Sequence, residues 1–242
     1  MIKKLINNFI SFFIFDSIYD IICLEKLGDK IMKGLFITFE GCEGSGKTSL
    51  INRLVAYLEN EGIKVYKTRE PGGSKIAEDI RNVILDVNNT NMDSITEALL
   101  YAASRRQHLV EKVIPYVEDG YVVICDRYLD SSLAYQGHAR GIGIDKVYDI
   151  NVAATNGMMP DLTIYIDLEP SIGLARIQNN NREQNRLDLE KMSFHKKVYE
   201  GYDIVRKRFS DRIKTVDGNQ TREKVLEDTI KIINPYLERM MK

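Results

Sequence analysis

The chain has 242 residues, of which 44% are hydrophobic and 29% are charged, a composition typical of one compact α/β domain. The formal net charge is -1, and no run of like charge is long enough to indicate a nucleic-acid-binding tail. The 3 cysteines and 3 histidines are widely spaced and form neither a disulfide framework nor a zinc-ligand pattern, so we expect a cytoplasmic protein.

The first 31 residues differ from the rest of the chain. An apolar stretch from Leu5 to Phe15 is too short to span about 30 Å of hydrocarbon as a helix, and no convincing signal-peptide cleavage site follows it. We expect residues 1–31 to be a non-essential leader or extension, with a packing extension and an interfacial membrane anchor as the alternatives. Met32 would be a natural start for the folded domain, which we expect to cover residues 32–242 without a membrane contact.

From residue 34 onward, short apolar runs alternate with helical patterns. Strands are expected at 34–39, 63–68, 121–125, 162–168 and 212–216. Helices are expected at 47–58, 75–86, 93–118 and 129–157, then in a segment that ends near 178, and at 188–209 and 221–240. This alternation predicts an α/β fold in which helices cover both faces of a five-stranded parallel sheet.

The strongest motif lies between the first strand and the first helix, where the chain matches the phosphate-loop pattern G-x-x-x-x-G-K-[ST] at every fixed position. Its glycines let successive backbone N–H groups point at a phosphate, and the helix N-terminus adds partial positive charge. Lys47 can reach the β and γ phosphates of a bound nucleotide, and the Thr48 hydroxyl can bind Mg²⁺. The predicted nucleotide-binding residues are Gly41, Cys42, Glu43, Gly44, Ser45, Gly46, Lys47 and Thr48.

A phosphate loop does not by itself define a function. The Asn-Lys-x-Asp sequence with which GTPases read guanine is absent, and motor and transport ATPases typically need larger machinery. A domain that binds nucleotide only as a regulatory switch stays open as an alternative.

Three clusters that contain arginine favour a second substrate instead. Residues 69–73 (Arg-Glu-Pro-Gly-Gly) follow the second strand, 126–128 (Asp-Arg-Tyr) follow the third, and 104–108 (Ser-Arg-Arg-Gln-His) lie in the long helix between them. Each cluster alone also fits an ordinary turn, a surface ion pair or an exposed basic helix face. Together with the phosphate loop they indicate a second phosphate site, because the planar fork of Arg binds phosphate oxygens in pairs.

The order of these motifs resembles bacterial thymidylate kinases from about residue 34 to the C-terminus. The resemblance rests on residues 39–48, 69–73, 101–108, 126–136 and 186–188. It implies a P-loop NTPase fold with a short helical lid at about 179–187, and phosphorylation of dTMP to dTDP by ATP with Mg²⁺ in the synthesis of dTTP. It also implies a homodimer. A kinase of another nucleoside monophosphate is the alternative.

The resemblance assigns roles at the acceptor site. Arg69 and Arg127 would hold the acceptor phosphate. Tyr101, where the family usually has Phe, would stack on thymine, while Arg105 and Gln136 would bind the base edge. The full set of implied substrate-binding residues is Glu43, Arg69, Arg81, Tyr101, Arg105, Arg127, Ser132, Tyr135 and Gln136.

Two of these residues would contact the sugar, since Glu43 would approach the 3′-hydroxyl and Tyr135 would crowd a 2′-hydroxyl. Arg81 and Ser132 would line the same pocket. Asp126 would lie near Mg²⁺, which gives Thr48 and Asp126 as the expected metal ligands.

The polar stretch 179–187 is the predicted lid. Phosphoryl transfer needs positive charge over the moving phosphate, and the variable phosphate-loop positions provide none. The family splits between members with a basic residue in the phosphate loop and members with it in the lid, and this chain resembles the lid type. The expected catalytic residues are therefore Lys47, Asp126, Arg127, Arg182 and Arg186.

Overall fold

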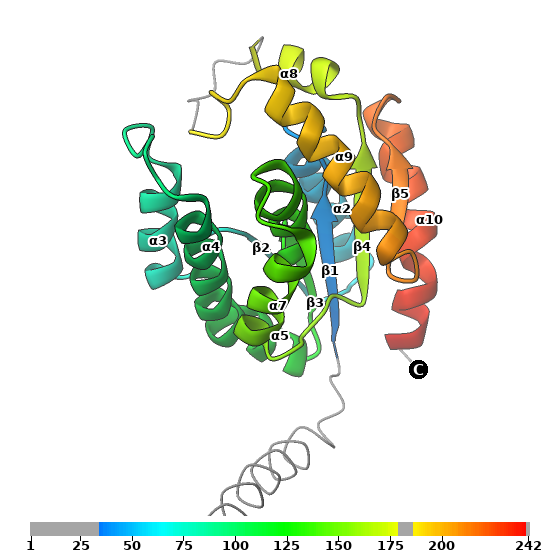
Figure 1. Ribbon diagram of the computed structural model, residues 1–242. Helices are drawn as coiled ribbons and strands as arrows, with labels where there is room; N and C mark the ends of the chain where they lie inside the picture. Colours follow the sequence, from blue (N-terminus) through cyan, green and yellow to red (C-terminus); the bar gives the residue numbers. More distant parts are fainter. Residues whose placement is uncertain (1–33, 179–185, 241–242) are drawn as a thin grey trace, which may run out of the picture. The chain divides into compact units, whose positions relative to one another are not determined.

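The computed structural model describes residues 34–178 and 186–240 (Figure 1). Its contacts divide the chain into two units, Met1–Met32 and Lys33–Lys242, and the fold described is that of the second unit. The predicted extension at residues 1–31 lies outside the described residues. So does most of the predicted lid, including Arg182.

Five parallel strands form one sheet in the order β2-β3-β1-β4-β5, as the sequence predicts. The strands are β1 (Leu35–Glu40), β2 (Val65–Arg69), β3 (Val122–Asp126), β4 (Leu162–Asp167) and β5 (Ile213–Asp217). Every residue of the central strand β1 is buried, whereas the edge strand β2 is only partly buried. This difference explains why most residues of β1 are apolar, whereas β2 contains Lys67, Thr68 and Arg69.

Helices follow each strand of the sheet. Those described are α2 (Lys47–Asn60), α3 (Lys75–Leu85), α4 (Ser94–His108), α5 (Ile114–Glu118), α6 (Leu129–Ser132), α7 (Ile144–Thr155), α8 (Pro170–Gln178), α9 (Met192–Arg208) and α10 (Arg222–Met240). Two π-helical segments, η1 (Leu109–Val113) and η2 (Leu133–Ala139), lie among them.

The structure subdivides two of the predicted helical stretches. The stretch predicted at 93–118 is α4, η1 and α5 in succession. The stretch predicted at 129–157 is interrupted between η2 and α7, where Gly141 and Gly143 both have positive φ angles that other residues rarely adopt. π-helical turns often accompany functional sites, and η2 carries Tyr135 and Gln136.

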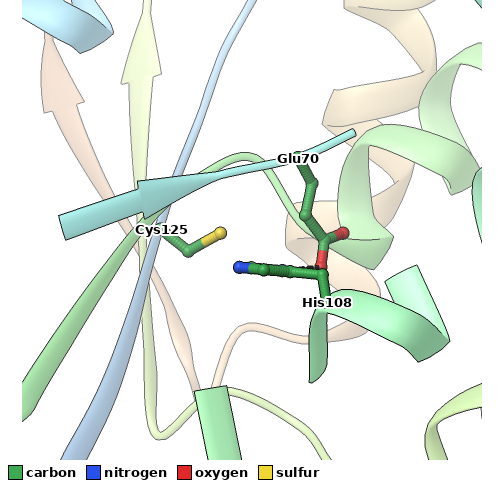
Figure 2. Close-up of side chains that lie close together, drawn as sticks. All are labelled: Glu70, His108 and Cys125. Atoms are coloured by element: carbon green, nitrogen blue, oxygen red, sulfur yellow. Dashed lines mark hydrogen bonds and ion pairs between the residues drawn. The ribbon is translucent and has the colours of Figure 1, made fainter. Parts of the chain in front are cut away.

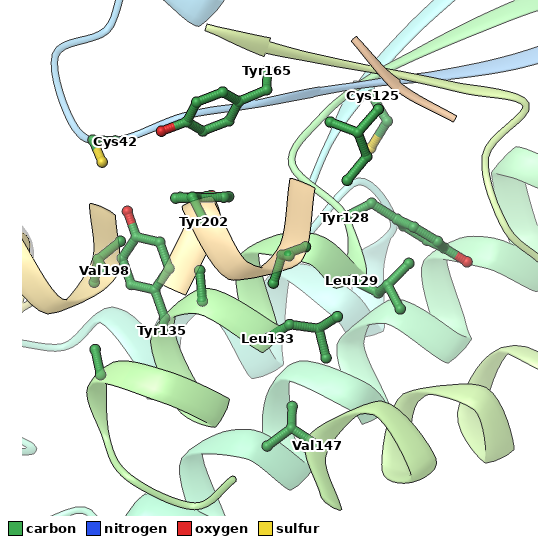
Figure 3. Packing of buried hydrophobic residues seen from close by; sticks show 14 of the residues in the cluster. Cys42, Cys125, Tyr128, Leu129, Leu133, Tyr135, Val147, Tyr165, Val198 and Tyr202 are labelled. Carbon is green, nitrogen blue, oxygen red and sulfur yellow. The ribbon is translucent and has the colours of Figure 1, made fainter. Parts of the chain in front are cut away.

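Two hydrophobic cores lie on opposite faces of the sheet. Alternate residues of β1 point to opposite sides, so Ile37 packs with α2 and α10 whereas Phe36 packs with α6, η2 and α9. Figure 3 shows the second core, in which Tyr128, Tyr165 and Tyr202 pack with aliphatic side chains. The fold is therefore the predicted three-layer α/β/α arrangement.

The strand register brings the predicted motifs to one edge of the sheet. Phe39 of β1 pairs with Asp126 of β3, and Arg69 of β2 pairs with the same Asp126. The segments that follow these three strands therefore emerge side by side at their carboxyl ends, which is where parallel α/β sheets bind ligands.

Candidate active site

The phosphate loop connects β1 to α2 and lies against the start of α8. Gly46 has a φ angle of 95° and immediately precedes the first residue of the helix. Gly44 has a φ angle of 70°, and a Cβ atom at this position would lie 2.0 Å from the carbonyl oxygen of Gly173 in α8. Only glycine fits this approach of two backbones.

The side chain of Lys47 is buried and folds back over its own loop. Its Nζ donates to the carbonyl oxygens of Gly41 and Cys42, both at 2.9 Å, and to the Ser45 hydroxyl at 3.3 Å. Burial, reinforced by Arg127, lowers the pKa of Lys47 from its ordinary value. The ammonium group is thus bound by neutral carbonyl and hydroxyl oxygens of the loop. Charged phosphate oxygens can replace them, because they form stronger hydrogen bonds with an ammonium group.

Thr48 and Asp126 are adjacent although they are far apart in sequence. The Thr48 hydroxyl donates to Asp126 Oδ2 at 2.9 Å, at the start of α2 and the end of β3. A hydroxyl and a carboxylate oxygen are the ligand types that Mg²⁺ prefers. The two residues predicted as metal ligands are therefore held together and fit that ion.

Arg127 connects the phosphate loop to α6 and α9. Its φ angle is 73°, which is uncommon for a residue other than glycine, and its guanidinium donates to Glu43 at 3.0 Å, Ser131 at 3.2 Å and Tyr202 at 2.9 Å. Tyr135 donates a hydrogen bond to the same Glu43 carboxylate.

The charges of this pair reinforce one another. Burial opposes ionisation of both groups, but the Glu43 carboxylate raises the pKa of Arg127 and the guanidinium helps to lower the pKa of Glu43. Both groups are therefore charged at neutral pH, and Arg127 is held at a fixed place beside the phosphate loop.

Glu40, which the sequence analysis did not single out, organises the segment after β3. It is 1% exposed and accepts hydrogen bonds from the backbone N–H of Tyr128 at 2.8 Å, the Ser131 hydroxyl at 2.5 Å and the Tyr202 hydroxyl at 2.8 Å. Burial and the nearby Asp130 raise its pKa. A buried acid at the end of a central strand was the available sequence signal.

One cavity of about 820 Å³ joins these groups. The phosphate loop lies at one part of its wall, and Arg69, Arg81 and Arg127 provide positive charge elsewhere. Arg69 is held by two bonds to Glu78, and Arg81 donates to the carbonyl oxygen of Pro71 at 2.7 Å. Burial, followed by the charge of Arg69, lowers the pKa of Arg81, as expected where several cations converge.

Most of the predicted site residues line this cavity. They are Glu43, Gly44, Ser45, Gly46, Lys47, Thr48, Arg69, Arg81, Tyr101, Asp126, Arg127, Tyr135 and Gln136. The lining also includes Arg53, Arg176, Arg222 and Ser131, to which no predicted role was attached. Those arginines stand outside recognisable motifs, so only the tertiary structure reveals them.

Arg105 and Ser132 are absent from the residues that line the cavity and bond to each other instead. Arg105 is 2% exposed, and its guanidinium donates to Glu70 at 2.8 Å, to Ser132 at 3.2 Å, to the Tyr128 carbonyl at 3.1 Å and to Asn151. Most N–H donors of the Arg105 guanidinium therefore already form hydrogen bonds within the protein. The adjacent Ser131, rather than Ser132, faces the cavity.

Glu70 extends this network to His108 (Figure 2). His108 lies between the Glu70 carboxylate at 2.9 Å and the Thr68 hydroxyl at 2.7 Å, and Cys125 is close to the same ring. Glu, His and Cys are metal-ligand types, and their ligand atoms here lie within 4.8 Å of one another. Both ring nitrogens and both Glu70 oxygens already have hydrogen-bond partners, and burial raises the pKa of the Cys125 thiol, so the group fits a structural network better.

Arg186 lies away from the phosphate loop's contacts. It is 9% exposed, and it donates to Glu97 at 2.5 Å and to the carbonyl oxygen of Ile84 at 2.9 Å. It thus joins α4 to the end of α3, and a contact with the γ-phosphate would require it to leave this buried ion pair. The phosphate contact predicted for Arg182 falls outside the described residues.

The fold and the phosphate loop place the chain in the class of P-loop nucleotide-binding α/β proteins, and the arginine-rich wall across the cavity suits the members of that class that transfer a phosphoryl group. The family model for thymidylate kinase matches residues 39–229. The chain belongs to the thymidylate kinase family, as the motifs predicted.

Individual relatives agree with this assignment. Thymidylate kinases of Bacillus thuringiensis (strain Al Hakam) and Bacillus cereus (strain B4264) are each 58% identical over 207 residues, which is 85% of this chain and 100% of theirs. The crystal structure of thymidylate kinase from Ehrlichia chaffeensis is similar with a TM-score of 0.67 at 31% identity, covering 83% of this chain and 98% of that one.

Proposed function

We propose that this chain transfers the γ-phosphoryl group of ATP to dTMP, forming dTDP and ADP in the supply of dTTP for DNA synthesis. The observation that carries the proposal is the single cavity that joins a phosphate loop to a wall with Arg69, Arg81 and Arg127. Two anionic substrates can meet in such a cavity with their phosphates facing each other. Family membership supports thymidylate as the acceptor.

At the nucleotide end, the loop residues 41–48 bind the phosphates of ATP through backbone N–H groups and Lys47. Lys47 exchanges its present contacts with Gly41 and Cys42 for phosphate oxygens. Thr48 and Asp126 hold Mg²⁺, which when bound neutralises charge on the phosphate oxygens.

At the acceptor end, Arg127 and Arg69 hold the dTMP phosphate, with Arg81 beside them. Glu43, already fixed by Arg127 and Tyr135, accepts a hydrogen bond from the sugar 3′-hydroxyl. Tyr135 leaves little space for a 2′-hydroxyl and so favours a deoxyribose.

The base lies against the ring of Tyr101, and Gln136 binds its edge. Tyr101 and Gln136 both line the cavity. Arg105 is buried and donates to Glu70, Ser132, Asn151 and the carbonyl oxygen of Tyr128. In this proposal, its remaining N–H group donates to the edge of the base.

No strong general base is needed for this reaction, because the acceptor phosphate is already an anion at neutral pH. Positioning and neutralisation of charge therefore account for catalysis. Of the two arginines predicted to cover the γ-phosphoryl group, we favour Arg182, since Arg186 is paired with Glu97.

We also propose that the chain forms a homodimer, which exposed apolar residues on its surface support. Large exposed apolar side chains gather on α3 and α4 and their connection, namely Ile76, Val83, Val87, Ile95 and Leu99. A pair of helices that leaves such residues uncovered is suited to packing against a second copy. In the part of the chain that the structure describes, no helix is long and apolar enough to cross a membrane. The cytoplasmic location stays a prediction.

The test is phosphoryl transfer from Mg-ATP to a panel of nucleoside monophosphates. We expect dTMP to give the highest kcat/KM. Faster turnover of AMP or GMP would indicate another monophosphate kinase. Tight ATP binding without transfer to any acceptor would indicate a regulatory nucleotide-binding domain.

A further inference from the structure

Glu97 is a buried carboxylate next to the acceptor part of the cavity. It is 1% exposed and lies in the first turn of α4, four residues before Tyr101, so the two side chains share one face of the helix. Neither the motifs nor the mechanism above gives it a role.

Three side chains converge on this carboxylate, two from η2 and its C-terminal end and one from the segment that precedes α9. Gln136 of η2 donates through Nε2 to Glu97 Oε1 at 2.8 Å, Arg186 donates to Oε2 at 2.5 Å, and Arg140 donates at 3.3 Å. Although burial opposes ionisation, these donors hold the pKa of Glu97 below its ordinary value. Glu97 is therefore an anion at neutral pH, and an ionised carboxylate can only accept hydrogen bonds.

The charge on Glu97 fixes the orientation of the Gln136 amide. Only the NH₂ group of an amide can donate to a carboxylate, so the carbonyl oxygen must point away from Glu97. Within residues 34–178 and 186–240, no protein group donates to that carbonyl oxygen. Gln136 is 1% exposed but lines the cavity together with Tyr101 and Tyr135. Its free acceptor is therefore available to a ligand there.

We propose that Glu97 is a positioning residue that holds the Gln136 carbonyl oxygen toward the acceptor base and so selects pyrimidines that carry an N3–H group. Thymine and uracil have this donor, whereas cytosine has a lone pair on N3 that a carbonyl oxygen repels. The proposal rests on the proposed function, because it assumes that the base of the acceptor monophosphate lies beside Tyr101. It adds a residue that acts through Gln136 without touching substrate.

Replacement of Glu97 by Gln releases the orientation of Gln136. The side chain of a glutamine can donate as well as accept, so the Gln136 amide can turn and offer its NH₂ group to cytosine N3. In E97Q we expect the preference for dTMP over dCMP, measured as the ratio of kcat/KM values, to fall about 10- to 100-fold. The preference for dTMP over dUMP should not change, since both bases carry N3–H.

The matched control is Glu190→Gln. Glu190 is the other carboxylate that pairs with Arg140, at 2.6 Å, so E190Q removes the same charge from the same cluster without contact to Gln136. Its dTMP:dCMP ratio should equal that of the wild type. A second comparison uses Gln136→Ala, which removes the amide. In that background E97Q should have no further effect on the ratio, because Glu97 acts only through Gln136.

An unchanged dTMP:dCMP ratio in folded E97Q overturns the proposal, as does an equal fall of dTMP:dUMP and dTMP:dCMP. If E97Q fails to fold, Glu97→Asp keeps the negative charge facing Arg186 and Arg140 but withdraws it from the amide. It should shift the dTMP:dCMP ratio in the same direction by about threefold or more, and an unchanged ratio would again refute the proposal. Wild-type enzyme that does not use dTMP at all would refute the proposed function instead.

Discussion

The two ends of the cavity are built in different ways. In the proposed arrangement, the phosphates of ATP are bound mainly by one continuous segment, residues 41–48 between β1 and α2, through successive backbone N–H groups. The acceptor end combines side chains from the ends of β2 and β3 with others from α3, α4 and η2. Most of those side chains have protein partners, as Arg69 has Glu78 and Arg81 has the carbonyl of Pro71.

The two constructions suit two different tasks, namely binding of any nucleotide phosphate and recognition of one particular base and sugar. A phosphate is the same in every nucleoside triphosphate, so a backbone cradle can bind it with little dependence on the neighbouring side chains. A particular base and sugar must be distinguished from close analogues, and this requires hydrogen-bonding side chains that are held in one orientation. Changes at the two ends should therefore affect different kinetic constants.

The largest effect is expected at the nucleotide end. Lys47→Ala should lower kcat about 10³-fold in a folded protein, because the lysine stabilises charge that develops during transfer. Steady-state kinetics at saturating dTMP measure this loss. The control is Lys231→Ala, an exposed lysine of α10. Near-normal turnover of the Lys47 variant would place catalysis elsewhere.

At the acceptor end, Arg127→Ala should raise the KM for dTMP about 100-fold and the KM for ATP much less. The substitution removes a phosphate-binding fork and leaves Glu43 without its 3.0 Å ion pair. Arg127→Lys keeps the positive charge but loses the planar guanidinium. Its KM for dTMP should lie between those of the wild type and Arg127→Ala. Equal changes of both KM values would show that Arg127 does not belong to one end of the cavity.

Arg186→Met should act mainly on stability. The substitution leaves the buried Glu97 with Arg140 and Gln136 as its remaining partners, which we expect to cost about 2 kcal/mol and to lower the Tm by roughly 4–8 °C. Thermal unfolding measures the shift, and Arg208→Met, which breaks the more exposed pair with Asp145, is the control with a smaller effect. An unchanged Tm with a large loss of kcat would instead support the phosphate contact predicted from sequence.

Two substitutions of Tyr101 distinguish the contribution of ring stacking from that of hydrogen bonding to the hydroxyl. Burial raises the pKa of its hydroxyl, and among the described residues no group bonds to that hydroxyl. Tyr101→Phe should therefore change the KM for dTMP less than about threefold, whereas Tyr101→Ala should raise it about tenfold or more through loss of stacking. A large effect of the Phe variant would assign the hydroxyl a role with the base.

The smallest effect is expected from removal of residues 1–31. A chain that begins at Met32 should match the full chain in kcat, in KM and in Tm, since all the motifs lie beyond residue 38. Parallel kinetics and thermal unfolding of the two chains test this. A clear loss of stability would show that the extension packs on the folded domain.

The sheet and the phosphate loop could be predicted because their signals are local. Each strand is a short apolar run, and the loop has fixed residues at fixed spacing. The family motifs gave the arginines of the acceptor wall, and Arg69, Arg81 and Arg127 do line the cavity. The π-helical turns at Leu109–Val113 and Leu133–Ala139 had no such signal, since apolar periodicity does not distinguish a π turn from an α turn.

Contacts between buried polar groups that are far apart in the chain could not be predicted from the sequence. Nothing in the order of residues shows that Arg186 meets Glu97, 89 positions away, or that Glu40 accepts from Tyr202, 162 positions away. An arginine in a polar stretch can face a substrate or a buried acid, and only tertiary contacts distinguish the two. The sequence also did not show that Ser131, rather than the predicted Ser132, lines the cavity. Successive residues on a helix point in directions that differ by about 100°, so an error of one residue moves the side chain away from the site.

The close approach of Gly44 to Gly173 bears on how the sequence can tolerate change. A Cβ atom on Gly173 would lie 2.1 Å from the carbonyl oxygen of Glu43, just as one on Gly44 would meet Gly173. Gly173 belongs to no recognisable motif, yet a mutational scan should find alanine there almost as harmful as in the phosphate loop. A random mutagenesis screen for inactive variants should therefore recover α8 substitutions that disable ATP binding from a helix remote in sequence.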